Sequence, residues 1–252
     1  MLPIADENEP GTGPAFVTLA LIAINVVVFF LLQGAGSNEA FTYGYSAVPL
    51  EISTGTDLTT PTDIVVGGQS EQIPQTPGPR PIWLTLFSSM FMHGGLLHLG
   101  GNMLFLWIFG DNVEYRIGRL RYLLFYLIAG VIASSAQILV DPTSPIPSLG
   151  ASGAISGVLG AYLVLFPGNR VTVFLFRFLT QVPAIVAIGM WAAFQFISGL
   201  GSLAATDQSA GGVAYMAHIG GFITGLVVGL IVRALFPRGP AAAPPAPRRV
   251  WG

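Results

Sequence analysis

The sequence predicts an all-helical membrane protein built from six transmembrane helices. The chain of 252 residues is 52% hydrophobic and only 9% charged, whereas soluble domains carry roughly 25% charged residues. Its mean hydropathy is +0.70. The sequence contains several apolar runs of about 20 residues each, which is the length that an α-helix needs to cross the hydrocarbon core. The 32 glycines suit the close helix packing found in lipid.

Six apolar runs are long enough, or nearly so, to span a bilayer. We place these runs at about residues 15–33, 95–113, 120–140, 149–166, 182–200 and 213–236. The residues before the first run contain acids but no Lys or Arg, unlike a secretory signal, so we expect a retained span. The fourth run is short and glycine-rich, and it lies between Pro147 and Pro167. We therefore expect other helices to enclose it.

The arginines predict the direction of the spans. All ten positive charges are arginine, and only Arg80 falls in a loop that follows an odd-numbered span. The others are Arg116, Arg119, Arg121, Arg170, Arg177, Arg233, Arg238, Arg248 and Arg249. By the positive-inside rule, both termini are cytoplasmic. We accordingly divide the chain into an N-terminal segment at 1–14, a six-span domain at 15–236 and a disordered Pro/Ala/Arg-rich tail at 237–252.

The first outer loop, at about residues 34–94, is long and has two parts. Residues 37–79 are rich in Thr, Gly, Pro and acids, and we interpret them as an irregular polar insertion. Residues 81–93 are apolar but too short to span, and Trp83 suits an interfacial position, so we expect this segment in the headgroup plane. The Gly/Ser/Ala-rich loop at 201–212 is predicted to act as a lid.

Polar residues recur near the outer ends of three apolar spans. His98 and Asn102 lie four apart in the second span, Ser152 starts the fourth, and His218 starts the sixth. These three spans all run from the outer to the inner face, and a helix rises 1.5 Å per residue, so the polar groups lie at similar depth. Such groups are costly inside a membrane, which indicates a functional site.

The residue types indicate nucleophilic catalysis. A serine nucleophile needs a base within hydrogen-bond reach, and His218 is the only histidine of the sixth span. The fourth and sixth spans contain no acid, so the interpretation is a Ser-His dyad without the third carboxylate of a triad. His98, Asn102 and the backbone N–H of Ser152, near a helix N-terminus, can donate to an oxyanion.

Taken together, these motifs resemble those of the rhomboid family of intramembrane serine proteases. The matching pieces, in the family's order, are His98-Leu99-Gly100-Gly101-Asn102, Gly150-Ala151-Ser152-Gly153, and Ala217-His218 with Gly221-Phe222-Ile223-Thr224-Gly225. The resemblance covers about residues 15–236 and implies a rhomboid-like six-span bundle. It implies Ser152 as nucleophile, His218 as general base, and His98, Asn102 and the Ser152 N–H as the oxyanion hole.

The resemblance also implies supporting roles and partners. Gly221 and Gly225 would let the sixth span pack against the fourth, and Glu114 fits a family position with a structural role. The substrates would be single-span membrane proteins, cut in or near their transmembrane segment, and no metal or organic cofactor is expected. Trp191 and Phe194 in the fifth span are candidates for a lateral substrate gate.

Two positions depart from the family's pattern. Trp83 is followed by Leu84 where family members often carry arginine. Some relatives place an aromatic residue four positions after the nucleophile, where this chain has Ser156. The ring of His218 must therefore pack against another residue.

Other interpretations remain open from the sequence alone. Ser156 is an alternative nucleophile, and Ser152 can be a small packing residue. His93, His98 and His218 could bind zinc, although His93 is more simply read as hydrogen-bonding loop backbone. A transporter and an inactive rhomboid-like binding protein are two further candidates.

The remaining composition narrows the setting. A net charge of -2 gives no reason to expect nucleic-acid binding. The absence of cysteine excludes disulfides and Cys-ligated metals. The tail composition and the lack of a targeting segment suggest a bacterial inner membrane, with the site opening to the outer face.

Overall fold

Each of the six predicted apolar runs contains a helix in the computed structural model, which describes residues 2–8, 13–66, 69–175, 177–204 and 214–236. These helices are α1 (Phe16–Val27, continued by a π-helical turn at Val28–Leu32), α5 (Leu96–Ile117), α6 (Arg119–Val140), α7 (Ser152–Leu165), α8 (Ala184–Ala204) and α9 (Tyr215–Leu235). The predicted disordered tail and most of the predicted lid lie outside the described residues.

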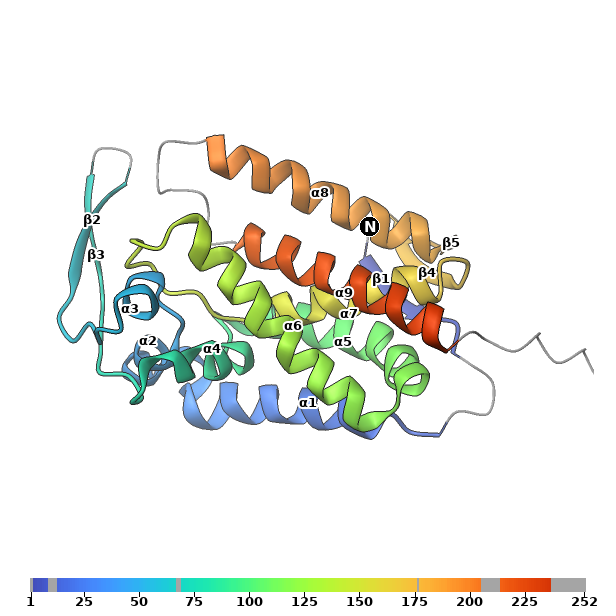
Figure 1. Ribbon diagram of the computed structural model, residues 1–252, viewed down its shortest axis with the longest axis horizontal. Coiled ribbons are helices and arrows are strands. Elements are labelled where there is room, and N and C mark those ends of the chain that lie inside the picture. Colours follow the sequence, from blue (N-terminus) through green and yellow to red (C-terminus); the bar gives the residue numbers. More distant parts are fainter. Residues whose placement is uncertain (1, 9–12, 67–68, 176, 205–213, 237–252) are drawn as a thin grey trace, which may run out of the picture.

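Helix α7 is the central helix of the bundle. It packs against α5, α6, α8 and α9, and most of its residues are buried. Figure 1 shows α8 along one edge of the molecule and α1 along the opposite edge. The short helix is enclosed because its small side chains let the neighbouring helices approach its backbone.

Several helices are suited to a bilayer. Within the described residues, α6, residues 184–201 of α8, and α9 are each long and apolar enough to cross a membrane. Helix α5 also qualifies when it is taken with the short helical turns at 82–91, from which it bends by 78°. Helices α1 and α7 are apolar but shorter. The chain is therefore an integral membrane protein with a helical core.

A small β-sheet corrects the prediction of an all-α fold. Strands β1 (Leu2–Asp6), β4 (Arg170–Leu175) and β5 (Phe178–Pro183) form an antiparallel sheet in the order β1-β4-β5. It lies at the right-hand end of Figure 1. Val171 and Val173 alternate toward the interior, which is the two-residue period of a half-buried strand. The N-terminal segment is thus partly an ordered strand.

The prediction that the polar insertion at 37–79 is irregular is wrong, because it contains regular helices and strands. It contains α2 (Glu39–Tyr45), α3 (Pro49–Thr54) and a hairpin of β2 (Thr62–Val66) and β3 (Gln69–Ile73). The side chain of Asn38 accepts a hydrogen bond from the Phe41 N–H and so caps α2. Gly55, at φ 70°, ends α3 in the left-handed conformation that glycine adopts most readily.

The insertion holds the loop that leads into α7. Four groups of the insertion donate hydrogen bonds to main-chain oxygens of that loop: Ala47 N to Ser148 O, Leu50 N to Ser144 O, Ser53 Oγ to Pro142 O, and Gln75 Nε2 to Pro145 O. The path of residues 142–148 is therefore fixed by a segment that lies 70 to about 100 residues earlier in the chain.

The bent segment of three short helical turns, η3 (Ile82–Leu84), α4 (Thr85–Ser88) and η4 (Ser89–Phe91), packs on α6 and on the start of α7. Met90 fills the space beside Gly130 of α6, where a methyl carbon would lie 1.8 Å from the Met90 sulfur. Leu84, which stands where relatives often have arginine, is exposed. The carbonyl of Ser89 accepts a hydrogen bond from the Gly150 N–H over 2.9 Å.

Glu114 joins α5 to the start of α1. Its buried carboxylate accepts hydrogen bonds from Val17 N at 3.0 Å, Thr18 N at 2.8 Å and Thr18 Oγ1 at 2.9 Å. The first N–H groups of a helix have no partner within it, and they favour a nearby negative charge. Glu114 supplies that partner from another helix.

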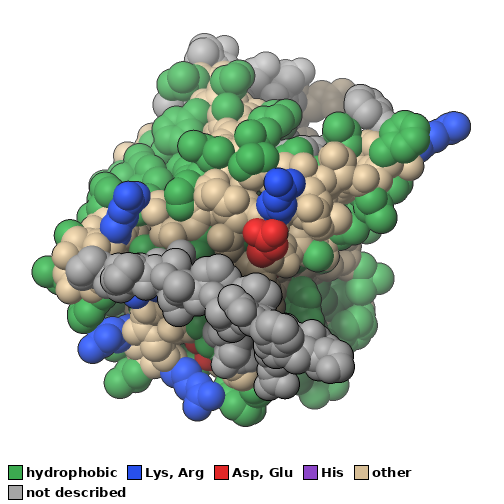
Figure 2. Space-filling view, turned by 90° about the vertical axis from the view of Figure 1, so that its right-hand side faces the viewer, with side chains coloured by type: hydrophobic (Ala, Val, Ile, Leu, Met, Phe, Trp, Pro, Cys, Tyr) green, Lys and Arg blue, Asp and Glu red, His purple; other side chains and the backbone are tan. Residues whose placement is uncertain are grey.

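Arginine side chains gather at one end of the molecule. Figure 2 looks onto the right-hand end of Figure 1 and shows them spread over it. Arg119 stacks over the Phe16 ring at 4.7 Å and Arg121 over the Phe236 ring at 5.4 Å. Arg80 lies instead in the first loop, just before η3. The arginines that predict the direction of the spans in the sequence are thus also found together at one end of the structure.

Strand β1 is anchored at this end through the carboxyl group of Asp6. Tyr162 OH and Asn112 Nδ2 both donate to Asp6 Oδ2, the latter over 2.8 Å. Burial, with a smaller contribution from the charge of Asp111, raises the pKa of Asp6 to about 7.

The docking of β1 is expected to weaken as pH rises. Because the pKa of Asp6 is higher in the folded state than its ordinary 3.8, its stabilising contribution is complete below about pH 4 and is lost as pH passes about 7. Hydrogen exchange at residues 2–6, corrected for intrinsic rates, should show more protection at pH 5 than at pH 8. Asp6→Asn should remove that difference, and equal pH dependence in the two proteins would contradict the prediction.

Candidate active site

Ser152 and His218 meet where α7 and α9 begin. Ser152 is the first residue of α7, and His218 lies in the first turn of α9. The His218 Nε2 atom is 2.8 Å from Ser152 Oγ, within hydrogen-bond distance. Both side chains are half-buried. The structure thus brings together a hydroxyl and an imidazole that are 66 residues apart in the chain.

Glycines explain how α7 and α9 approach each other closely enough for this contact. A methyl carbon on Gly221 would lie 2.0 Å from the Gly153 carbonyl oxygen, and one on Gly225 would lie 1.9 Å from the Gly157 carbonyl oxygen. No real side-chain carbon fits at such distances. The two helices are therefore in backbone contact along the face that carries His218.

A residue that the sequence analysis missed completes the surroundings of His218. Gln195, in the middle of α8, is buried, and its Oε1 atom is 2.9 Å from His218 Nδ1. The signal in the sequence was a single glutamine inside an otherwise apolar span, which is costly without a partner. The acceptor beside His218 is thus a neutral amide from α8, and not a carboxylate from α7 or α9.

The ring of His218 packs against an aromatic residue from α8. The centroids of the Trp191 and His218 rings are 6.2 Å apart, and Trp191 also contacts the Phe222 ring at 5.9 Å. At position 156, where the family resemblance led us to look for an aromatic residue against the histidine ring, this chain has serine. Trp191 of α8 supplies the aromatic contact instead. Trp191, one of the two predicted gate residues, thus adjoins the histidine.

His98 lies across Gly150 from Ser152. Its Nδ1 atom accepts a hydrogen bond from the Gly94 N–H at 3.3 Å, so the neutral ring carries its proton on Nε2. A methyl carbon on Gly150 would lie 3.0 Å from that Nε2 and 3.6 Å from Ser152 Oγ. The histidine donor and the serine hydroxyl therefore border one small space, which the absent side chain of Gly150 leaves open.

Two further donors come from the same two helices, α5 and α7. Asn102 follows His98 by about one turn of α5, is 8% exposed, and its Nδ2 atom has no hydrogen-bond partner within the described part of the chain. The Ser152 N–H, in the first turn of α7, has no acceptor within its own helix. These groups are the ones that the sequence analysis considered for an oxyanion hole.

Ser156 and His93 take other places. The Ser156 hydroxyl is buried and donates to the Ser152 carbonyl one turn earlier at 2.6 Å, so it does not meet His218. His93 was expected to bond loop backbone through its ring. Instead, the Gln33 side chain holds the backbone N–H and C=O of His93, and the ring nitrogens have no partner among the residues described.

The histidines are not arranged as a metal site. Within the described ranges, no group of three His, Asp or Glu side chains lies close enough to hold a metal ion. His93 and His98 have ring centroids 5.1 Å apart, but His218 is engaged by Gln195 and Ser152. The three histidines therefore do not come together as the three nitrogen ligands of the zinc alternative.

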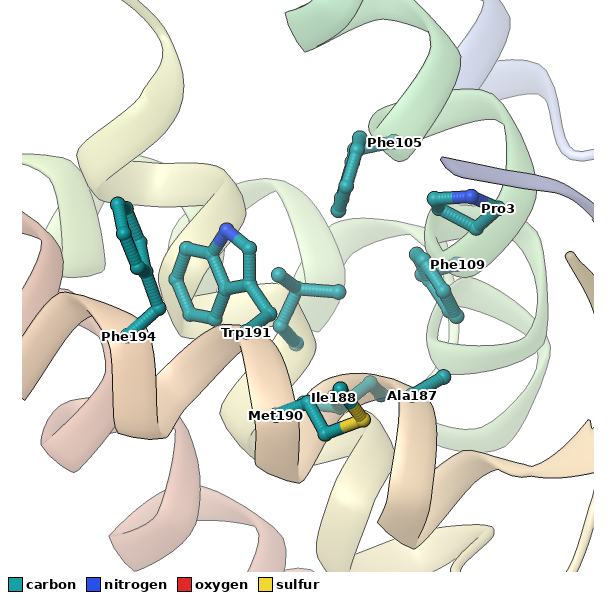
Figure 3. Close-up of a pocket in the computed structure, with 9 residues that line it drawn as sticks. Pro3, Phe105, Phe109, Ala187, Ile188, Met190, Trp191 and Phe194 are labelled. Atoms are coloured by element: carbon teal, nitrogen blue, oxygen red, sulfur yellow. The ribbon is translucent and has the colours of Figure 1, made fainter. Parts of the chain in front are cut away.

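An apolar pocket opens between α5 and α8 beside the site. It has a volume of about 260 Å³. Its lining residues are Pro3, Phe105, Phe109, Leu159, Ala187, Ile188, Met190, Trp191 and Phe194. Figure 3 shows Trp191 and Phe194 from α8 and Phe105 and Phe109 from α5 around this space. Both predicted gate residues thus line the pocket.

Comparison with known proteins gives consistent results. Residues 80–235 match the Rhomboid domain family. The chain is 33% identical over 218 residues to the rhomboid protease GluP of Bacillus subtilis, covering 86% of this chain and 36% of that protein. It is also 33% identical over 157 residues to the mitochondrial rhomboid protein 1 of Saccharomyces cerevisiae, covering 58% of this chain and 41% of that protein. The chain thus spans well under half the length of these relatives.

Proposed function

Because the chain belongs to the rhomboid family, we propose that it is an intramembrane serine endopeptidase. The observation that carries the proposal is the 2.8 Å separation between Ser152 Oγ and His218 Nε2. A serine hydroxyl becomes a nucleophile when an adjacent base can take its proton. The relative whose alignment covers 86% of this chain, GluP of Bacillus subtilis, is a rhomboid protease, and this supports protease activity for the chain.

In the proposed reaction, Ser152 Oγ attacks the carbonyl carbon of the scissile peptide bond while His218 Nε2 accepts the hydroxyl proton. The carbonyl oxygen gains negative charge and accepts hydrogen bonds from His98 Nε2–H, Asn102 Nδ2–H and the Ser152 N–H. The proton on Nε2 then passes to the leaving amine, and the peptide bond breaks. His218 then accepts a proton from a water molecule, whose oxygen attacks the acyl carbon. As the bond from that carbon to Ser152 Oγ breaks, His218 returns the proton to Oγ and the carboxylic acid product leaves.

The proposal extends to the membrane setting. All six apolar helices cross the bilayer with both termini in the cytoplasm, which is supported by the arginines gathered at one end. Ser152 then faces the outer side, where water can reach it. Substrates are single-span membrane proteins that enter laterally beside α8, where the apolar pocket lies against α5. The bacterial relative supports a bacterial inner membrane.

Covalent labelling tests the nucleophile directly. The purified full chain in liposomes is treated with a fluorophosphonate, which reacts with activated serines, and the adduct is located by mass spectrometry. In parallel, cleavage of a fluorescent single-span substrate is followed with and without a metal chelator. We expect an adduct on the peptide that contains Ser152, and cleavage that the chelator does not change.

Other outcomes would redirect the proposal. Cleavage lost in chelator would indicate a metal site instead of a dyad. A folded protein that forms no adduct and cleaves nothing would favour the inactive binding protein. An adduct at Ser156 would move the nucleophile by one turn.

A further inference from the structure

We propose that Gln195 is a positioning residue that fixes the proton of His218 on Nδ1 and so leaves Nε2 free to act as the base toward Ser152. This inference rests on the proposed protease function. In a catalytic triad, a carboxylate usually orients the histidine. Under this proposal, the neutral amide of Gln195 from α8 takes that role.

The contact between Gln195 and His218 is short and protected from solvent. Gln195 Oε1 lies 2.9 Å from His218 Nδ1, and the Gln195 side chain is 8% exposed. On the other side of the ring, Nε2 lies 2.8 Å from Ser152 Oγ. Both ring nitrogens are thus engaged, each by one oxygen, so the ring is held between α7 and α8.

The chemistry of the two contacts assigns the proton. A neutral imidazole has one N–H donor and one acceptor nitrogen. The oxygen of an amide only accepts, so Nδ1 must carry the proton when it faces Gln195 Oε1. Nε2 is then the acceptor nitrogen, as a general base requires. The opposite tautomer would leave Nδ1 facing an acceptor without a proton between them, and its Nε2 could not accept from Ser152.

The same contact stabilises the charge that forms during reaction. When Nε2 takes the Ser152 proton, the ring becomes an imidazolium and its Nδ1–H still points at the Gln195 oxygen. The amide dipole stabilises that positive charge without itself taking a proton, because an amide oxygen is not a base at neutral pH. A carboxylate would also give Nδ1 an acceptor oxygen, but it would lose its hydration in this buried position, which a neutral amide avoids.

Helix α8 holds the ring from two sides. Trp191 precedes Gln195 by about one helical turn, so both side chains lie on the same face of α8. The Trp191 ring packs beside the His218 ring at 6.2 Å, while Gln195 hydrogen-bonds its edge. Rotation of the imidazole away from Ser152 would require both contacts to be lost. Gln195 therefore sets the tautomer, and Trp191 restricts the tilt.

Three substitutions separate this role from a general effect on folding. Gln195→Leu removes the acceptor and keeps much of the volume, and Gln195→Glu returns an acceptor oxygen at the same place. Gln137→Leu is the matched control. Gln137 is a half-buried glutamine of α6 whose Oε1 accepts from Met216 N at 3.2 Å, so its hydrogen bond goes to the α9 backbone, whereas the ring nitrogens of His218 bond to Gln195 and Ser152.

Two readouts are combined. The first is kcat and KM for the fluorescent single-span substrate in liposomes. Gln195→Leu should lower kcat about tenfold to a hundredfold with KM nearly unchanged, the effect of losing one hydrogen bond of 1.4 to 2.7 kcal/mol in the transition state. Gln195→Glu should recover most of that loss, and Gln137→Leu should stay near the wild type.

The second readout does not depend on activity. Nitrogen-15 NMR of labelled histidine distinguishes the two neutral tautomers, and the chain has only three histidines. Comparison with His93→Gln and His98→Gln assigns the signals of His218. The wild type and Gln195→Glu should show a protonated Nδ1 and a bare Nε2. Gln195→Leu should lose that preference.

The outcomes are distinguishable from those of the protease proposal. A wild-type protein that cleaves, together with Gln195→Leu that keeps both kcat and the protonated Nδ1, would overturn the role of Gln195 alone. Equal losses of kcat in Gln195→Leu and Gln137→Leu would reduce it to packing. A wild type without cleavage or a fluorophosphonate adduct would overturn the protease proposal, while the NMR result still reports on the hydrogen bond.

Discussion

Replacing Ser152 with alanine is expected to lower kcat by roughly 10⁴- to 10⁶-fold while KM changes little, because the hydroxyl takes part in bond formation and not in substrate binding. His218→Ala should lower kcat by about as much, because the Ser152 hydroxyl then lacks the base that lies 2.8 Å away, His218 Nε2, and keeps its proton. The double variant should be no worse than either single variant, because the two residues act as a unit. Single-turnover cleavage in liposomes measures all three rates.

Ser156→Ala is the matched control for that experiment. It makes the same chemical change one turn further along α7, where the hydroxyl only donates to the Ser152 carbonyl. We expect its cleavage rate to remain within about tenfold of the wild type, given the modest net value of one such hydrogen bond. The nucleophile assignment fails if Ser156→Ala abolishes cleavage and Ser152→Ala does not.

Gly225→Ala is expected to damage both stability and activity. The new methyl carbon would lie 1.9 Å from the Gly157 carbonyl oxygen and 2.8 Å from Ala161 N, and neither backbone atom can rotate away. Helix α9 must therefore shift as a body, at a cost of about 2–4 kcal/mol. His218 lies about two turns earlier in the same helix, so the shift also separates it from Ser152.

The loss of that alignment should lower kcat by about a hundredfold or more, the scale expected for reacting groups displaced by about 1 Å. Gly189→Ala is the control, because a methyl carbon on Gly189 of α8 has no atom within 4 Å. It should leave activity intact and leave stability equal or higher by up to about 1 kcal/mol. Thermal unfolding in detergent and cleavage in liposomes measure both effects. Equal behaviour of the two alanine variants would contradict the account of the α7–α9 contact.

Residues with local signals could be placed from the sequence. The six apolar runs predicted where α1, α5, α6, α7, α8 and α9 lie, because apolar length is visible in a short window. The glycines at 221 and 225 indicated close packing, and α9 does lie against α7 at those positions. Family membership followed from the spacing of the polar residues and is established by the family match over residues 80–235.

Features that depend on distant partners could not be placed in that way. Strand β1 is five residues long, and its partner β4 lies in a different part of the sequence, with Leu2 opposite Phe174. A glutamine inside an apolar span indicates that Gln195 has a polar partner, but only the packing of α8 beside α9 shows that this partner is His218. The short helices of the insertion had local signals at Asn38 and Gly55, but its polar composition obscured them.

The polar insertion holds the loop at residues 142–148 by hydrogen bonds to main-chain oxygens of the loop, which a change of an exposed loop side chain leaves in place. The Thr143 side chain itself bonds only within the loop, where its Oγ1 donates to Asp141 Oδ1 at 2.9 Å. Thr143 is exposed within this loop, and the chain contains no cysteine. Thr143→Cys therefore creates a unique attachment point for a fluorophore or spin label. A label there reports on the loop that leads to Ser152 while every hydrogen bond from the insertion stays in place.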